Sequence, residues 1–151
     1  MQMTGMLAAA ALALGAIVVT PHLPLEHRTQ VQHASGTVDA EYRGTVTLAA
    51  RQIGTPAPGG RASTLRCEWT AGLAVEREAR HAGGGLLSRT IDDADGLKLS
   101  RAGWCNAHRN DVAQHFAERS DELHRQLLAV AEADRDILVS QVERQLAMTA
   151  G

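Results

Sequence analysis

The feature that most constrains the fold is a strict alternation of apolar and polar residues along two long segments. In residues 38–50 the apolar residues Val38, Ala40, Tyr42, Val46, Leu48 and Ala50 share one face, and charged residues or threonines occupy the other. A period of two is typical of a β-strand with one buried face. The same alternation returns in residues 63–78, after the glycine- and proline-rich residues 54–60. The two segments therefore predict a long antiparallel hairpin.

Two shorter apolar segments follow, at residues 86–91 and 97–100, on either side of the acidic residues 92–96. The sequence Asp92-Asp-Ala-Asp-Gly96 does not fit a calcium loop, because Ile91 and Ala102 would stand where ligating oxygens are required. Aspartate and glycine favour turns, so the segment predicts a second hairpin. Residues 37–105 are thus expected to form a four-stranded antiparallel meander.

After Cys105 the apolar period changes to 3.6, which predicts an amphipathic helix over residues 106–148 with Asn106 or Asn110 as its N-cap. Its apolar stripe consists of Val112, Phe116, Leu123, Leu127, Val130, Ile137 and Leu138. Arg119, Asp134 and Gln141 interrupt this stripe, so it fits a sheet better than a coiled coil. We expect an α+β fold with this one helix packed on the sheet, either straight or broken near Ala133 and Asp134.

The N-terminus carries an uncharged apolar run at residues 6–19, followed by Pro21 and Pro24. Its length fits the apolar region of a signal peptide, whereas a spanning helix needs about 20 residues and a buried helix would show a polar face. Residues 1–20 are therefore interpreted as a signal peptide or an uncleaved membrane anchor, and residues 21–36 as a polar tether. Both interpretations predict a periplasmic or secreted domain, with membrane contact only through this segment.

The chain has two cysteines, Cys67 and Cys105, without the close spacing of a zinc or redox motif. In an exported protein they are expected to form a disulfide, whereas in the cytoplasm they would be two reduced, buried thiols. The bridge would attach the start of the helix to the second strand, with Trp69 and Trp104 packed around it. Such a staple matters here because the chain has only four aromatic residues and a thin core.

The charge distribution argues against nucleic acid binding. The net charge is −2, and the 15 basic residues are scattered among 17 acidic ones rather than gathered in a stripe.

No residue pattern predicts a cofactor, a metal ion or a catalytic centre. His108 and His115 share a helix face but are separated by about 10 Å along the axis, too far to bind one ion. The sequence shows neither a nucleophile elbow nor a serine paired with a placed base, and Ser35, like the other serines, has an ordinary strand, turn or helix context. Glu76 and Glu78 lie on one strand face near Arg77 and Arg80, which is typical of a solvated surface.

Two functions are compatible with these features. The first is a non-enzymatic envelope module that binds a protein, a peptide or an apolar ligand, or that forms a homodimer through the C-terminal helix. The alternative is a small exported hydrolase with Glu68, Glu76 or Asp95 as the acid in a groove. The hydrolase requires a carboxylate buried enough to raise its pKa.

Overall fold

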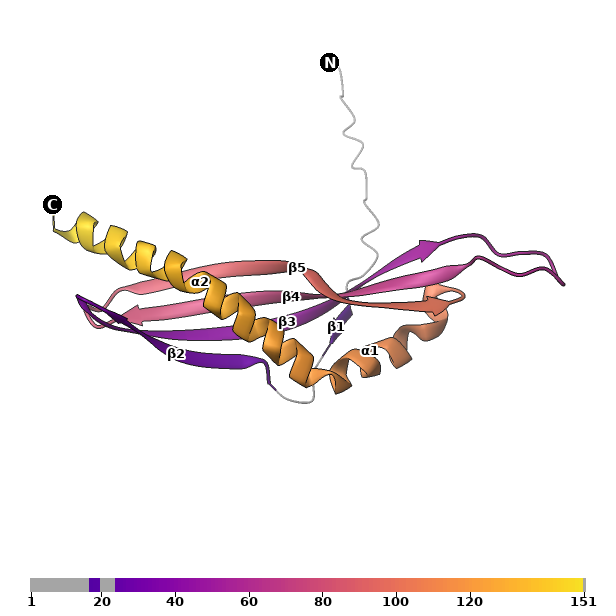
Figure 1. Ribbon diagram of the computed structural model, residues 1–151, viewed down its shortest axis with the longest axis horizontal. Helices are drawn as coiled ribbons and strands as arrows, with labels where there is room; N and C mark the ends of the chain where they lie inside the picture. Colours follow the sequence, from indigo (N-terminus) through magenta and orange to yellow (C-terminus); the bar gives the residue numbers. More distant parts are fainter. Residues whose placement is uncertain (1–16, 20–23, 151) are drawn as a thin grey trace, which may run out of the picture.

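A computed structural model describes residues 17–19 and 24–150, and the side chains of residues 24–92 and 96–150. It confirms the α+β class: a long antiparallel sheet packs against the C-terminal helix (Figure 1). The described strands are β1 (Ile17–Val19), β2 (Glu26–His33), β3 (Gly36–Ile53), β4 (Arg66–His81) and β5 (Leu86–Ala102). Strand β3 pairs with β4, and β4 pairs with β5. The other edge of β3 pairs with β2 and, further along, with β1.

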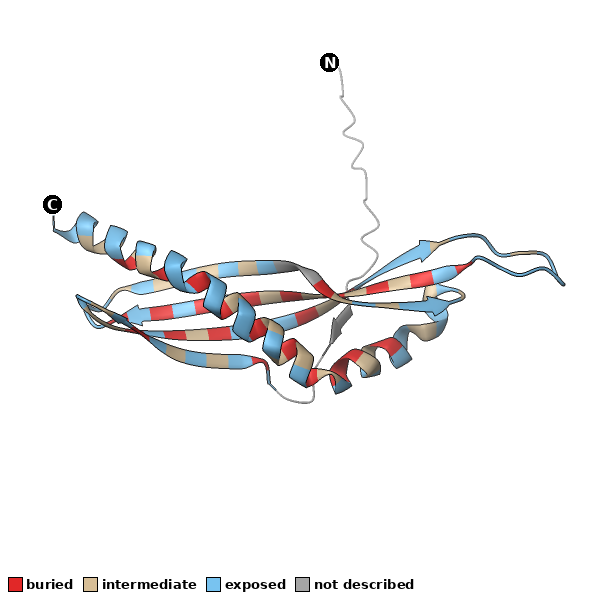
Figure 2. Cartoon of the chain, in the orientation of Figure 1, coloured by how far each residue is buried: buried red, intermediate tan, exposed pale blue. Residues whose placement is uncertain are grey.

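The two alternating segments form the long central strands β3 and β4, as predicted. On β4 every second residue from Cys67 to His81 is buried, and the residues between them are exposed or half-buried. Figure 2 shows the same alternation along β3 and a buried stripe on the helix. The core lies between these faces, and the opposite sheet face is polar.

The predicted tether is partly wrong, because residues 26–33 form strand β2 and pair with residues 36–43 of β3. Leu25 and Val31 are each only 4% exposed, so this segment belongs to the folded domain. The strand is polar in composition because it lies at the sheet edge, with one side facing water and Val31 its one fully buried residue.

The predicted signal peptide or anchor lies outside the described residues except for Ile17–Val19. These residues form β1 opposite Val46–Leu48 of β3. No helix in the described part of the chain is both long and apolar enough to span a membrane.

The predicted second hairpin is also wrong: residues 86–102 form one strand, β5, along β4. Asp93 lies opposite Leu73 and Leu97 opposite Ala71, so the acidic segment is an irregularity within the strand and not a turn. Gly96 makes this geometry possible, because a Cβ atom there would lie 1.7 Å from the carbonyl oxygen of Ala71. A β-bulge accommodates extra residues that a sequence pattern alone presents as a turn.

The C-terminal segment is not one helix. A 3₁₀ turn (Cys105–His108) leads into α1 (Arg109–Glu118), and α2 (Ser120–Thr149) follows after a break at Arg119. The Arg119 N–H bonds to the Phe116 carbonyl, and the Ser120 hydroxyl donates to the Ala117 carbonyl at 2.7 Å. The helix therefore breaks at Arg119, and it is continuous through Ala133 and Asp134.

Candidate functional site

Cys67 and Cys105 form the disulfide, with their Cα atoms 5.0 Å apart. The bridge joins the inner face of β4 to the 3₁₀ turn that precedes α1. Gln52 also connects these segments. Its amide oxygen accepts a hydrogen bond from the Cys105 N–H at 2.8 Å, and its amide nitrogen donates to the carbonyls of Arg66 and Gly103. The bridge thus attaches the helical segment to the second long strand, as the sequence suggested.

The two tryptophans behave differently. Trp69 is 2% exposed in the core, but Trp104 is 57% exposed. Trp104 stands before the 3₁₀ turn in extended backbone conformation and does not pack in the core around the bridge. The expectation for Trp104 was therefore wrong.

Most of the predicted helix stripe faces the sheet. Val112, Phe116, Leu123, Leu127 and Leu138 are buried, Val130 is half-buried against the core, and Ile137 is 39% exposed. The buried face is completed by Ala131, Asp134 and Val142, which the sequence pattern did not single out. Asp134 was expected to interrupt the stripe, yet it lies at its centre.

Asp134 is the focus of a buried polar network between α2 and the sheet. Its carboxylate accepts hydrogen bonds from the Tyr42 hydroxyl at 2.9 Å and from Arg77 Nε at 2.8 Å. Arg89 also pairs with Asp134, and Gln141 accepts a hydrogen bond from Arg77 at 2.7 Å. The side chains of Arg77 and Asp134 are 0% and 1% exposed, so the ion pair is fully removed from water.

Burial and the charges in this network shift the pKa values of Asp134 and Tyr42. Burial alone would raise the pKa of Asp134, but the hydrogen bonds from Arg77, Tyr42 and Arg89 outweigh burial and lower it. Burial raises the pKa of Tyr42, and the neighbouring Asp134 carboxylate raises it further. Asp134 is therefore an ionised anchor. A general acid needs a raised pKa, so Asp134 does not fit that role.

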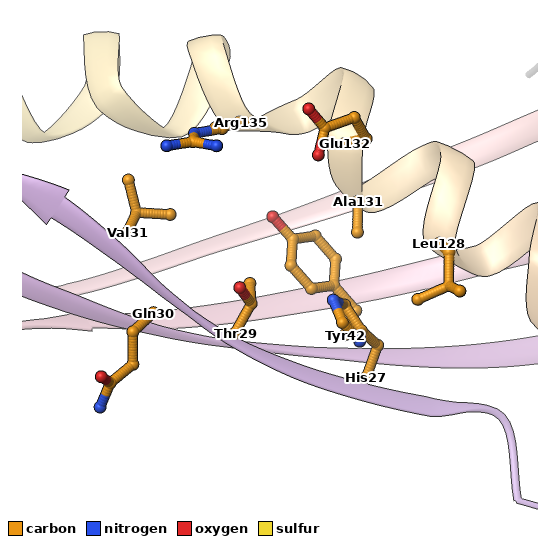
Figure 3. A pocket seen from close by; sticks show the side chains of 9 residues that line it. All are labelled: His27, Thr29, Gln30, Val31, Tyr42, Leu128, Ala131, Glu132 and Arg135. Atoms are coloured by element: carbon orange, nitrogen blue, oxygen red, sulfur yellow. The ribbon is translucent and has the colours of Figure 1, made fainter.

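A cavity of about 170 Å³ lies beside this network, between β2 and α2 (Figure 3). Its volume corresponds to about six water molecules in the liquid. The ring of Tyr42 forms part of its wall, and the ring of His27 stacks on Tyr42 with centroids 6.2 Å apart. The full lining is His27, Thr29, Gln30, Val31, Tyr42, Leu128, Ala131, Glu132 and Arg135. The Tyr42 hydroxyl donates to Asp134, so the network fixes one wall of the cavity.

The helix side of the cavity carries two opposite charges, Glu132 and Arg135, one helical turn apart. Among the described residues neither side chain has an ion-pair partner. Figure 3 shows both side chains at the upper edge of the cavity, above the Tyr42 ring. The lining is mainly polar, with Val31, Leu128 and Ala131 as its aliphatic residues. Polar groups that converge on one cavity fix the orientation of a small ligand.

The acids of the predicted hydrolase lie elsewhere. Glu76 is exposed and Glu68 half-buried, and both project from the face of β4 opposite the buried residues. The side chain of Asp95 lies outside the described residues. Asp134 is the one buried carboxylate of the described side chains. Within those same ranges no group of three or more histidine, cysteine or acidic side chains is arranged to hold a metal ion.

No protein-family model, curated protein or solved structure matches the chain. The proposed function therefore rests on the geometry of the described residues.

Proposed function

We propose that the chain is an exported module, periplasmic or secreted, that binds a small ligand in the cavity between β2 and α2. The observation that supports binding is the cavity with two opposite charges, Glu132 and Arg135, neither of which forms an ion pair with another described residue. The disulfide is consistent with an oxidising compartment. The apolar run at residues 6–19 supports export as a signal peptide or an uncleaved anchor.

The charges indicate the class of ligand. Glu132 attracts a cationic group and Arg135 an anionic group, and the wall between β2 and α2 contributes apolar contacts from Val31, Ala131 and Leu128. A short zwitterion satisfies both charges at once, with its carbon chain against these three aliphatic side chains. The small volume limits the ligand to a few heavy atoms, or to the end of a longer one.

The test uses 4-aminobutanoate as the probe, with butanoate and butylamine as controls that each keep the carbon chain and lack one charge. Millimolar 4-aminobutanoate should shift the backbone amide signals of residues lining the cavity in a ¹H–¹⁵N NMR titration. Glu132→Gln and Arg135→Gln should each weaken binding at least several-fold, because each removes one charge-assisted contact.

The matched control is Arg144→Gln, on the same helix but outside the cavity, which should bind the probe as the wild type does. Butanoate and butylamine should bind more weakly than the zwitterion. A wild-type protein whose cavity signals stay unmoved, or binding that survives in Glu132→Gln and Arg135→Gln, would refute the proposed site.

A further inference from the structure

A second group of reactive side chains lies at one corner of the sheet, away from the cavity. The corner comprises His33 at the end of β2, Ser35 in the turn between β2 and β3, His81 at the end of β4, and Glu143 from the C-terminal part of α2. The Ser35 hydroxyl oxygen lies 2.6 Å from His33 Nδ1 and 2.9 Å from His81 Nε2. His33 Nε2 lies 3.5 Å from a carboxylate oxygen of Glu143. Ser35 and His81 are 46 positions apart in the sequence, and His33 and Glu143 are 110 apart, so the fold brings distant segments together at this corner.

Backbone hydrogen bonds fix the direction of these contacts. The Ser35 N–H donates to His33 Nδ1 at 3.2 Å, and the Gly83 N–H donates to His81 Nδ1 at 3.3 Å. Both Nδ1 atoms are thus acceptors, and a neutral imidazole then carries its proton on Nε2. It follows that His81 Nε2–H donates to the Ser35 oxygen, and that the Ser35 hydroxyl shares the single lone pair of His33 Nδ1 with the Ser35 N–H. The Nε2–H of His33 faces Glu143.

We propose that Ser35 is a nucleophile toward activated acyl and phosphonyl groups, with His33 as its general base and Glu143 as a positioning residue. The arrangement has the order of a nucleophile, a base and an orienting carboxylate. Ser35 is exposed, whereas the His33 side chain is 16% exposed and His81 is 7% exposed. An external substrate can therefore reach the hydroxyl while the imidazoles are held in place. This activity goes beyond the proposed binding and does not depend on it.

With an ester as substrate, Ser35 and His33 carry out the acyl transfer and the proton transfers that accompany it. The Ser35 oxygen forms a bond to the carbonyl carbon while its proton passes to His33 Nδ1. The bond to the leaving alcohol breaks, and His33 returns the proton to that alcohol. Water then attacks the acyl-serine and loses its proton to His33; the bond to the Ser35 oxygen breaks, His33 returns the proton to that oxygen, and the acid is released. His81 Nε2–H contacts the Ser35 oxygen and positions the hydroxyl beside His33.

The test is covalent labelling of the full chain with a fluorophosphonate probe, located by peptide mass spectrometry. In this reaction the Ser35 oxygen bonds to phosphorus, fluoride leaves, and the proton passes to His33. We expect one adduct, on Ser35, and none in Ser35→Ala. His33→Gln should slow labelling about 100-fold, in the range of a lost general base. His124→Gln, a histidine of α2 outside the corner, should label at the wild-type rate.

Glu143→Gln should slow labelling and alter its pH profile, because a neutral amide no longer stabilises the imidazolium. Thermal unfolding of each variant shows whether the fold is intact, and Ser35→Thr provides a second variant that retains a hydroxyl. The inference fails if wild-type protein takes up no probe or takes it up on another residue. It also fails if a folded His33→Gln protein labels as fast as the wild type. Neither outcome depends on whether the cavity binds a zwitterion.

Discussion

Replacing Asp134 with asparagine should lower the free energy of unfolding by about 3–5 kcal/mol, the usual cost of breaking a buried ion pair by removing one partner. The variant leaves the buried Arg77 guanidinium without a counter-charge, and Arg77 is 1% exposed. Urea denaturation followed by circular dichroism measures the change. Asp136→Asn, on the exposed side of the same helix, is the matched control and should change stability by less than about 0.5 kcal/mol.

The pH dependence of stability provides a second measure of Asp134. Its pKa is lower in the folded protein than the ordinary value of 3.8, so the unfolded chain binds the proton more readily. The stability that ionised Asp134 contributes is complete above the unfolded pKa. It is lost as the pH falls from about 4 through the folded pKa. Asp134→Asn should lack this component of the acid dependence.

A double variant shows how much of the stability change comes from the ion pair and how much from the packing of the two side chains. Arg77→Met combined with Asp134→Leu removes both fully buried charges and should cost less than either single change, since the one remaining partner, Arg89, is 32% exposed and can be hydrated. If each single change costs less than about 1 kcal/mol, the network does not hold α2 on the sheet.

The second large effect concerns the disulfide. Cys67→Ser and Cys105→Ser should each cost about 4 kcal/mol, because the bridge closes a loop with a sequence separation of 38 residues. The double substitution should cost about as much as either single one, since all three variants lose the same bridge. A reducing agent should bring the wild-type melting temperature close to that of the double variant and leave the latter unchanged. Serine variants that melt at the wild-type temperature would contradict the structural role of the bridge.

The central strands were predictable because each has one buried face and one exposed face, which produces a clean period of two. Strand β2 was missed because an edge strand with one fully buried residue, Val31, resembles a polar tether in composition. The strand β5 was divided in two because a bulge and a turn attract the same residues, as Gly96 illustrates. In both cases the strand forms by pairing with β3 or β4, which the residues of the strand alone do not indicate.

The sequence analysis did not predict the polar network, because Arg77 and Asp134 lie in separate segments whose patterns were considered one at a time. Arg77 has the inward parity of β4, between Val75 and Ala79, and Asp134 lies three residues after Ala131 on the inward face of α2. Two opposite charges on the inward faces of two packed elements are a signal for a buried ion pair. Neither the cavity nor the corner around Ser35 could be found this way, because each needs β2, or the turn after it, to lie against α2.

The disulfide-closed domain includes strand β2, and we propose that the protein is exported. The most direct test is peptide and intact-mass analysis of the protein isolated from its own cells after immediate thiol alkylation. We expect no alkylated cysteine and an N-terminus at or before Leu25, because Leu25 and Val31 are buried in the fold. Alkylation of both Cys67 and Cys105, or an N-terminus after Ala34, would contradict this expectation.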